Sequence, residues 1–495
     1  MSATEAAGLV FETVIGLEVH AELATRTKLF CGCPNRYGAP PNSAVCPVCL
    51  GLPGVLPVPN RRAVELLILA GRALGCEIAR LSKFDRKNYF YPDMPKNFQT
   101  SQYDMPLAEH GALEFEVGSR VHRVRIHRIH LEEDAGKSVH VAEGRQDVAG
   151  RLGDSDYTLV DYNRAGVPLL EIVSEPDLRA PEEAAACLEA LRDLLRWLEV
   201  SDCKMEEGSL RCDANVSLRA RGSLELGTKV EIKNMNSFRS VASALAFEEV
   251  RQRELLEQGG RVVQETRTWD EERGVTVSMR GKEHAHDYRY FPEPDLAVLV
   301  VDRAWLDRVD ASIPELPAVR ARRYRQDPGL TPAQASWLTS SRSQADFFEA
   351  AGGTLEVATW MANELSRLAR ESGIDLAQGR LRPQALAEVL GLVNRGTISN
   401  KGGRELLEHL FREGGEPAEL VERLGLAQIS GEDALQEEVL AVLQDHPQAV
   451  EEFRSGKDKA LNVLVGQLMK RTRGRANPQV ARNLLAQAAL RGEEG

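Results

Sequence analysis

The sequence predicts an α+β protein in which a β-rich domain of antiparallel sheets precedes a helical domain and a small helical tail. Residues 12–23, 209–220 and 227–234 alternate between apolar and polar side chains. Such alternation favours strands with one buried face, as in antiparallel sheets. After residues 292–295 the pattern turns helical. A chain of 495 residues is too long for one hydrophobic core. We therefore expect three domains, at residues 1–295, 296–414 and 415–495.

The composition excludes several classes of protein. The chain carries 62 Lys and Arg against 74 Asp and Glu, a net charge of −12. This charge disfavours attraction of the whole surface to nucleic acid, but it leaves room for a local basic patch. The sequence has no apolar run that could cross a membrane, and it starts without the features of a secretory signal. Eight cysteines in so long a chain do not indicate disulfide dependence, so we expect a cytoplasmic protein with no membrane partner.

The alternating segments carry their charged residues on one face. In the first segment, Glu18 and His20 point away from the side that Leu17 and Val19 occupy. The other two segments place a larger polar set in the same way: Arg211, Asp213, Asn215, Lys229, Glu231 and Lys233. Such a polar face is either plain solvent surface or the floor of a site.

Helices interrupt the strands and later replace them. Residues 181–200 carry leucines at helical spacing with a proline in the first turn, and residues 238–258 form a second helix that two glycines end. Residues 331–334 match a capping box with proline at the first helical position. Gly414 and Gly415 mark the start of the tail.

Two close cysteine pairs, Cys31 with Cys33 and Cys46 with Cys49, form the pattern C-x-C-x12-C-x2-C. Two pairs separated by a loop match a tetrahedral Zn²⁺ site, and four thiolates leave no open position for chemistry. We therefore expect a structural zinc ion in the loop 31–49. The alternatives are a disulfide or two chance pairs.

A second candidate centre consists of carboxylates. Because alternate residues of a strand point the same way, Glu18 and His20 face one space. Residues 130–134 and 170–177 put further acids near strand ends. Several carboxylates with one imidazole suit Mg²⁺, which prefers oxygen ligands. Each acid by itself could equally be a solvated surface group.

Three other stretches bear on function. Residues 134–138 end like a phosphate-binding loop, but Leu131 replaces the glycine that a Walker motif needs, which excludes that fold. Residues 84–93 mix charged and aromatic side chains, which suits a lined tunnel or a surface loop. Residues 455–478 form a basic amphipathic helix, typical of nucleic-acid backbone contact or of a solvated face. Its cations are Lys457, Lys459, Lys470, Arg471, Arg473 and Arg475.

Longer strings identify a family. ETVIGLEVH (12–20), FDRKNYFYPD (84–93) and HLEEDAGKS (130–138) resemble the B subunit of the tRNA-dependent amidotransferases. Further strings resemble it in the expected order over almost the whole chain: LLEIVSEPD (169–177), KMEEGSLRCDANVSLR (204–219), DYRYFPEPDL (287–296) and LVGQLMK (464–470).

The resemblance implies a ligase subunit that acts on misacylated Glu-tRNA(Gln), Asp-tRNA(Asn) or both. It implies that ATP and Mg²⁺ serve to phosphorylate the side-chain carboxylate, which ammonia then converts to the amide. The ammonia is expected from a glutaminase A subunit through a tunnel, and a small C subunit completes a heterotrimer. The final domain is expected to bind tRNA through its basic helix.

The same resemblance implies roles for individual residues. The catalytic metal cluster is expected to be Glu18, His20, Glu133 and Glu171, with His20 an unusual ligand for magnesium. The ammonia route is expected to be lined by Lys87, Tyr89, Tyr91 and Asp93. Our own assignment, based on the polar strand faces, gives the ATP and acceptor-end pocket to Arg211, Asp213, Asn215, Lys229, Glu231 and Lys233.

Two other functions are compatible with parts of the sequence. A non-enzymatic, zinc-containing RNA-binding scaffold explains the cysteines and the basic tail, but it does not explain why Glu18 lies beside His20. A self-sufficient glutaminase needs a nucleophile with an activating base. No recognisable motif in the sequence supplies that pair.

Overall fold

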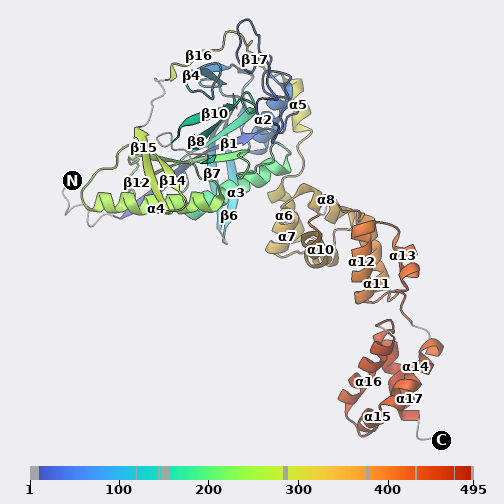
Figure 1. The fold of residues 1–495 in the computed structure, drawn as a ribbon. Helices are drawn as coiled ribbons and strands as arrows, with labels where there is room; N and C mark the ends of the chain where they lie inside the picture. Colours follow the sequence, from blue (N-terminus) through green and yellow to red (C-terminus); the bar gives the residue numbers. More distant parts are fainter. Residues whose placement is uncertain are drawn as a thin grey trace. The chain divides into compact units, whose positions relative to one another are not determined.

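The computed structural model describes residues 10–118, 120–142, 145–146, 155–281, 288–374, 379–429, 432–472 and 474–491. The chain forms two compact units, residues 1–316 and 317–495. Within the described residues, all strands lie in the first unit, and the second is helical (Figure 1). This confirms the α+β class with helices at the C-terminal side. The three-domain division at residues 295 and 414 stays a prediction. Within the described residues, no helix is long and apolar enough to cross a membrane.

The centre of the first unit is a sheet whose described strands have the order β15-β14-β13-β12-β1-β11-β7-β6-β2. Neighbouring strands are antiparallel, except that β13 runs parallel to β14. The three alternating segments of the sequence are β1, β12 and β13, which lie next to one another. The strands are β1 (Phe11–Glu22), β2 (Glu77–Ile78), β6 (Ala108–Val117), β7 (Arg120–Glu133), β11 (Pro168–Ser174), β12 (Leu210–Ala220), β13 (Val230–Lys233), β14 (Glu265–Asp270) and β15 (Val275–Gly281).

Smaller sheets and four described helices complete the first unit. The order β10-β8-β9 joins Tyr157–Asp161, Lys137–Ala142 and Arg145–Gln146, and the order β16-β4-β5 joins Phe291–Pro292, Asp85–Asn88 and Phe98–Ser101. Strand β17 (Leu299–Val300) pairs with β3 (Leu81–Ser82). The helices are α2 (Arg61–Ala73), α3 (Pro181–Trp197), α4 (Phe238–Glu257) and α5 (Arg303–Asp310).

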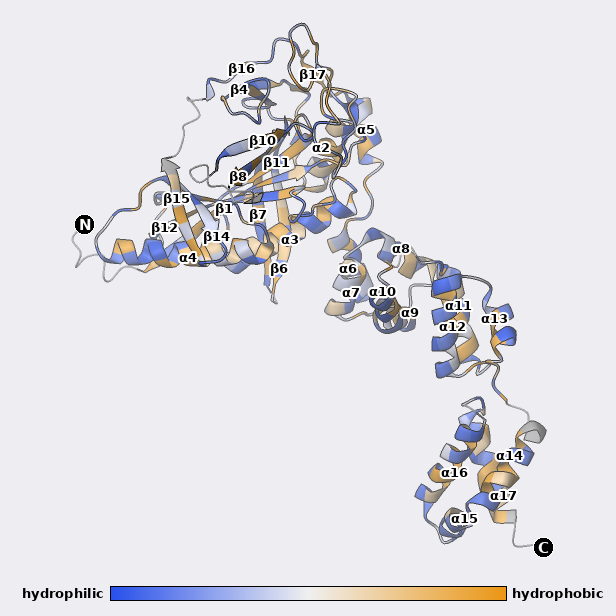
Figure 2. Ribbon diagram, in the orientation of Figure 1, coloured by the Kyte–Doolittle hydropathy of each residue, from blue (hydrophilic) through white to orange (hydrophobic). Residues whose placement is uncertain are grey.

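Helices α3 and α4 cover the apolar face of β1 and β12 (Figure 1). Helix α3 starts at Pro181, as predicted, and buries the leucines that the sequence placed on one side. Leu17 and Val19 of β1 are buried on this face. Hydrophobic and hydrophilic bands alternate along both helices in Figure 2, as expected for helices with one buried side. The opposite, polar face of β1 and β12 is left free of this helix layer.

The second unit consists of short helices. Thr331 and Gln334 form the predicted capping box at the start of α7, with both reciprocal hydrogen bonds present. The helices are α6 (Pro317–Gln326), α7 (Pro332–Leu338), α8 (Arg342–Ala350), α9 (Leu355–Trp360), the π-helical turn η3 (Met361–Leu365), α10 (Ser366–Ser372), α11 (Pro383–Asn394), α12 (Asn400–Glu413), α13 (Pro417–Leu424), α14 (Glu432–Asp445), α15 (Pro447–Arg454), α16 (Asp458–Arg471) and α17 (Pro478–Arg491).

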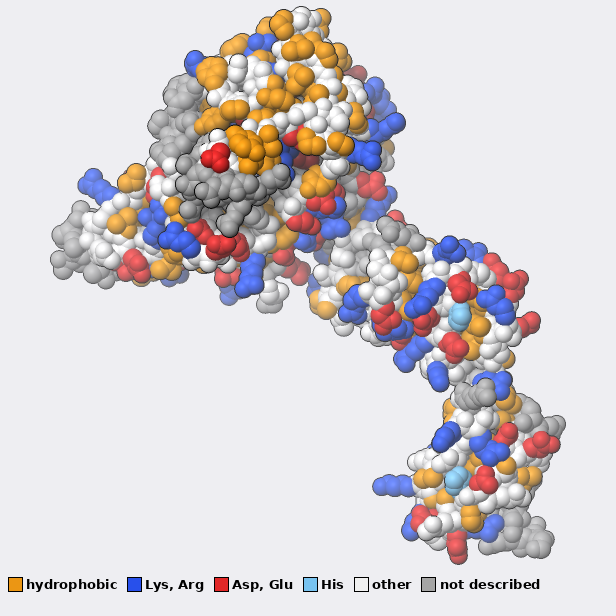
Figure 3. Space-filling model, viewed as in Figure 1, with side chains coloured by type: hydrophobic (Ala, Val, Ile, Leu, Met, Phe, Trp, Pro, Cys, Tyr) orange, Lys and Arg blue, Asp and Glu red, His pale blue; other side chains and the backbone are white. Residues whose placement is uncertain are grey.

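The two units differ at their surfaces. In Figure 3, hydrophobic side chains gather on the part of the first unit that carries β16 and β17. Leu56, Phe291, Val298 and Val300 are among the exposed large hydrophobic residues of the first unit. Around α11 to α13 the visible surface is mainly a mixture of acidic and basic side chains.

Candidate functional site

Strand register builds the polar face of the large sheet. His20 of β1 lies opposite Glu171 of β11 on one side and opposite Arg211 of β12 on the other. Glu171 in turn lies opposite His130 of β7. Because residues directly opposite each other in a sheet project to the same face, the four side chains meet on one surface. Glu18 joins them through the alternation of β1.

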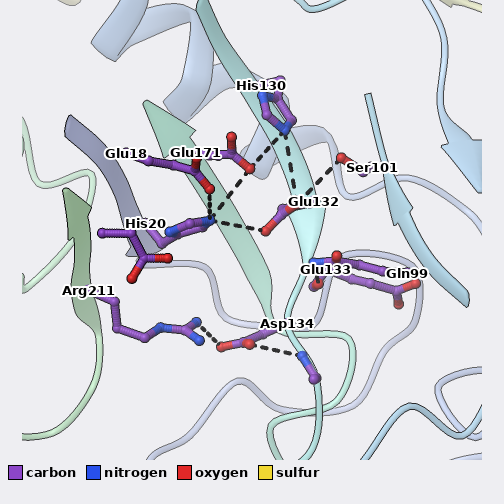
Figure 4. A network of polar contacts seen from close by, with 12 residues as sticks. Glu18, His20, Gln99, Ser101, His130, Glu132, Glu133, Asp134, Glu171 and Arg211 are labelled. Carbon is purple, nitrogen blue, oxygen red and sulfur yellow. Dashed lines mark hydrogen bonds and ion pairs between the residues drawn. The ribbon is translucent and has the colours of Figure 1, made fainter. Parts of the chain in front are cut away.

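A cluster of carboxylates surrounds the imidazole of His20 (Figure 4). His20 Nε2 lies 3.8 Å from Glu18 Oε1, 3.6 Å from Glu132 Oε1 and 3.4 Å from Glu171 Oε2. A second imidazole, that of His130, lies with Nε2 3.3 Å from the same Glu171 oxygen. Glu132, Glu171 and His130 are buried, and Glu18 and His20 are partly exposed. The cluster thus opens to solvent on the side of β1.

The electrostatics of this cluster favour cations. Burial alone lowers the pKa of His20, but Glu171, Glu132 and Glu18 raise it to about 9. Burial and the neighbouring Glu171 raise the pKa of Glu18. Burial opposes ionisation of Glu171, yet His130 and His20 hold its pKa well below its usual value. Three carboxylates in one place therefore need positive charge, and protonated His20 supplies part of it when no metal is bound.

These residues fit a divalent cation. Glu18, His20 and Glu171 offer ligand atoms that all lie within 4.8 Å of one another, and so do His130, Glu132 and Glu171. Oxygen donors from carboxylates are what Mg²⁺ prefers, and the imidazoles also suit Mn²⁺. The sequence prediction that distant acids meet beside His20 holds for Glu18 and Glu171.

The prediction that Glu133 belongs to this cluster is not matched by the geometry. Strand β7 alternates, so His130 and Glu132 face the cluster and Glu133 faces away. The Glu133 carboxylate instead forms an ion pair with Lys96 and accepts a hydrogen bond from the backbone N–H of Thr100 at 2.8 Å. Sequence reasoning missed Glu132 and His130. Their spacing of two residues places both on one face of a strand, but only the register of β7 against β11 decides which face of β7 joins the cluster.

Asp134 follows β7 directly and lies at the edge of the polar face, beside Arg211 of β12. It forms ion pairs with Arg211 and Arg164, the latter at 3.5 Å between Nε and Oδ2. Glu22 of β1 lies close to Asp134, Arg211 and Arg164. Burial and the charge of Asp134 raise the pKa of Glu22 to about 7. Neither Glu22 nor Arg164 was selected from the sequence. The two arginines and two acids form a nearly neutral cluster next to the acidic one.

The residues assigned to the ATP and acceptor-end pocket lie along β12 and β13. Asp213 pairs with Lys233, whose Nζ is also 3.5 Å from Glu231 Oε1. Asn215 lies opposite Glu231 in the register of the two strands, so the polar face is continuous from β1 to β13. Lys229 is exposed just before β13. Their role in binding stays a prediction.

The predicted ammonia route begins beside the cluster. Burial opposes the charge of Lys87, but the carboxylates of Glu132 and Glu171 and the nearby tyrosine hydroxyls raise its pKa. The Lys87 ammonium lies 5.1 Å from the ring centre of Tyr288. Tyr89 packs against Tyr91 and Tyr288, with ring centres 5.9 and 6.5 Å apart.

The rest of this wall is aromatic. Tyr290 stacks on Tyr103 with ring centres 4.1 Å apart, and it also contacts Tyr288. Sequence reasoning selected Lys87 and the tyrosines that follow β4, but not Tyr288 and Tyr290, although the string 287–296 was noted. Asp93 follows Tyr91 by two residues, and its backbone carbonyl accepts a hydrogen bond from the backbone N–H of Gly136 at 2.8 Å.

The four cysteines of the loop 31–49 converge as predicted. Their sulfur atoms lie within 4.8 Å of one another, and all four are free thiols rather than disulfides. The Sγ atoms of Cys46 and Cys49 are 4.0 Å apart, close to the edge of about 3.8 Å that four Zn–S bonds of a tetrahedron define. A hydrogen bond from Cys31 lowers the pKa of the Cys49 thiol to about 5. This donor set fits a closed, structural Zn²⁺ site.

The basic helix of the tail is α16. Leu461, Leu464 and Leu468 form its buried side, as predicted. Lys457, Lys459, Lys470 and Arg475 are exposed. Arg471 is bound by Glu438 and Asp445 at 2.8 and 3.1 Å, which reduces its availability to an anion. Arg473 lies outside the described residues.

Comparison with family models defines the class of protein to which this fold and site correspond. A model described as "GatB/GatE catalytic domain" matches residues 13–307, and one described as "GatB domain" matches residues 346–488. The chain therefore belongs to the GatB/GatE family of amidotransferase subunits, and the resemblance found in the sequence is confirmed.

Individual relatives narrow this assignment. Proteins named as the B subunit of aspartyl/glutamyl-tRNA(Asn/Gln) amidotransferase, from Carboxydothermus hydrogenoformans and Moorella thermoacetica, are each 53% identical to the chain over 479 residues. The matches cover 96% of this chain and 98% and 99% of the relatives. The protein of that name from Thermomicrobium roseum is 53% identical over 484 residues, which are 97% of this chain and 98% of the relative. The alternative of a non-enzymatic scaffold gains no support from these relatives.

Proposed function

We propose that the chain is the amidating subunit of an aspartyl/glutamyl-tRNA(Asn/Gln) amidotransferase. In this role it converts misacylated Glu-tRNA(Gln), Asp-tRNA(Asn) or both into the amide, with ATP as the source of the activating phosphate. The observation that carries the proposal is the group of Glu18, His20, Glu132 and Glu171 on one open sheet face, in a chain of this family.

The chemistry explains why such a face is needed. A free carboxylate reacts poorly with ammonia because its leaving group is oxide, and phosphorylation supplies a better leaving group. Phosphoryl transfer depends mainly on positioning and on cations that offset the charge of the phosphates. Glu18, His20, Glu132 and Glu171 are the residues that would hold Mg²⁺, which supplies that positive charge when bound. Glu133 is omitted from this set because its carboxylate faces Lys96.

The chain's own cations would then orient the substrates. Arg211 and Lys233 project from β12 and β13 on the polar face, and both are anchored by ion pairs with acids. An anchored guanidinium is a preorganised donor for phosphate or carboxylate oxygens. We place the triphosphate and the acceptor end along this side of the face, with Asp213, Asn215, Lys229 and Glu231 completing it.

Ammonia would approach from the side of Lys87. The ammonium group of Lys87 faces Glu132 and lies next to Tyr89 and Tyr288. It can therefore order water and hold the approaching ammonia by hydrogen bonds. We therefore keep Lys87, Tyr89, Tyr91 and Asp93 as the proposed route, and place its inner end at the Glu132 carboxylate.

Partners complete the activity. Relatives of this chain carry the name of a subunit, so we propose a heterotrimer with a glutaminase A subunit and a small C subunit in the cytoplasm. The hydrophobic side chains that gather on the part of the first unit with β16 and β17 support a partner there, because exposed apolar patches mark protein contacts. The exposed lysines of α16 support tRNA binding by the tail. Zn²⁺ would hold the loop 31–49 in shape.

The test is an assay of the reconstituted complex with both misacylated tRNAs. We expect ATP cleavage and amide formation that depend on misacylated tRNA, and we expect Glu171→Gln to lose both while tRNA still binds. Full activity of Glu171→Gln would contradict the role of the cluster. Binding of tRNA without any stimulated ATP cleavage would instead favour the scaffold. Comparing the two tRNAs decides the substrate.

A further inference from the structure

A lysine is completely buried beside the cysteine cluster. Lys28 has no solvent-exposed surface, and it precedes Leu29, whose backbone N–H bonds to the carbonyl of Gly166. Its ammonium has two partners: the sulfur of Cys49 at 3.7 Å and the backbone carbonyl of Tyr162 at 3.2 Å. Among the described residues, no carboxylate forms an ion pair with it.

A zinc-ligating sulfur would compensate this buried ammonium, because cysteine binds Zn²⁺ as the thiolate. Burying an ammonium group away from water costs several kcal/mol unless a charge of opposite sign compensates it. The carbonyl of Tyr162 supplies only a dipole, whereas Cys49 would supply a thiolate in contact with the ammonium when it ligates Zn²⁺. Four thiolates around one Zn²⁺ leave an excess of negative charge, which a single buried ammonium partly neutralises. The ammonium of Lys28 and the zinc-bound thiolates therefore stabilise each other by compensating charge.

We propose that Lys28 is a positioning residue of the cysteine-bound zinc, which donates an N–H···S hydrogen bond to the Cys49 thiolate and thereby retains the ion. The inference rests on the proposed zinc site. Partners outside the ligand set that orient a ligand commonly change metal retention by about ten- to a hundredfold.

The same lysine ties the cysteine loop to the end of the polar face. It holds the carbonyl of Tyr162, and the turn that follows continues to Gly166, whose N–H bonds to the carbonyl of Asp134 at 2.9 Å. Asp134 is the acid that anchors Arg211. Lys28 thus links the sulfur cluster to the polar face through the backbone turn 162–166, whose last residue hydrogen-bonds to Asp134.

The experiment measures metal retention in the full-length chain rather than activity. The zinc-loaded protein is mixed with a chromophoric chelator, and the rate of zinc release is compared for wild type, Lys28→Met, Lys28→Gln and Lys28→Arg. We expect Met and Gln to release zinc about tenfold faster. Arg, which keeps a charged donor, should stay closer to wild type. Lys401→Met, at an exposed lysine of α12, is the control and should match wild type.

A spectroscopic readout separates this role from a general packing effect. In the cobalt-substituted protein the thiolate-to-metal charge-transfer band reports the donor strength of the sulfurs, and we expect it to shift in Lys28→Met and Lys28→Gln but not in Lys401→Met. Gel filtration selects folded protein, and Lys28→Gln serves if Lys28→Met fails to fold. Zinc release and a cobalt spectrum that are unchanged in a folded Met or Gln variant would overturn the inference. A wild-type chain that binds neither zinc nor cobalt would overturn the proposed zinc site and, with it, this inference.

Discussion

Nε2 of His20 lies 3.4 Å from Oε2 of Glu171, its register partner on the neighbouring strand. The two side chains come from segments about 150 residues apart in sequence, and the sheet alone brings them together. Changing Glu171 to Gln keeps the shape and removes the charge. We expect amide formation to fall by at least about a hundredfold, because charge stabilisation at the phosphoryl group is lost. The measurement is product formation at saturating tRNA, with tRNA affinity as the control.

Glu132 and Glu133 give a matched pair for a second prediction. Glu132→Gln removes a carboxylate 3.6 Å from His20 Nε2, so the affinity for Mn²⁺ should fall by about tenfold. Glu133→Gln should leave that affinity nearly unchanged. It should instead destabilise the fold by about 3 kcal/mol, because Lys96 loses its buried partner. Calorimetric Mn²⁺ binding and thermal unfolding distinguish the two. Equal loss of Mn²⁺ binding in both variants would show that Glu133 is also a ligand of the metal.

Removal of zinc should loosen the loop 31–49 more than it slows the chemical step. In Cys33→Ser the four-sulfur site loses one ligand, and the loop loses the ion that closes it. Hydrogen exchange of the loop should become faster, while amidation driven by added ammonium chloride falls by less than about tenfold. Unchanged exchange in Cys33→Ser would show that no metal organises the loop.

Acid should weaken the second unit through Glu349. Burial raises the pKa of Glu349, but hydrogen bonds from Arg320, Arg323 and Tyr324 lower it to about 2, from a usual value of 4.5. Because the folded-state pKa lies below the unfolded one, the ionised carboxylate stabilises the fold above pH 4.5, and this contribution is lost as the pH falls toward 2. Glu349→Gln should therefore lower the unfolding temperature near neutral pH.

The pH profile is the control for that prediction. The difference in unfolding temperature between wild type and Glu349→Gln should shrink as the pH falls below 4.5. A difference that stays constant down to about pH 3 would mean that the variant acts through packing rather than charge.

The tail should bind tRNA through its exposed lysines. Lys459→Ala and Lys470→Ala should each reduce the slope of log affinity against log salt concentration by about 1. Arg471→Ala should change the slope less, since Glu438 and Asp445 already bind that guanidinium. Filter binding at several salt concentrations measures this. A larger effect of Arg471→Ala than of either lysine variant would contradict the assignment.

The strand pattern and the cysteine spacing carried most of what the sequence could predict. The alternation of β1 and β12 predicted both the antiparallel sheet and the common face of Glu18 and His20, because side-chain direction in a strand is a local property. The alternation of β7 does not by itself decide whether Glu132 or Glu133 faces the metal cluster. That choice depends on the register of β7 against β11, which only the folded sheet fixes.

Residues outside the strands were harder to find. Tyr288 and Tyr290 reach Lys87 because β16 pairs with β4 across about 200 residues of sequence, a long-range contact that composition does not encode. Lys28 was overlooked because a single lysine beside an apolar residue looks like any surface cation until its burial is known.

Strand β1 hydrogen-bonds on both edges, to β11 and to β12. One of its faces packs against the helix layer, and the other carries the side chains of the polar face. Inserting one residue between Gly16 and Leu17, with the start of β1 held in register, would turn Glu18 and His20 into the helix layer and expose Val19 in their place. A change of two residues would keep each side facing the same way. Length variation tolerated at this position during evolution or engineering should therefore come only in even steps.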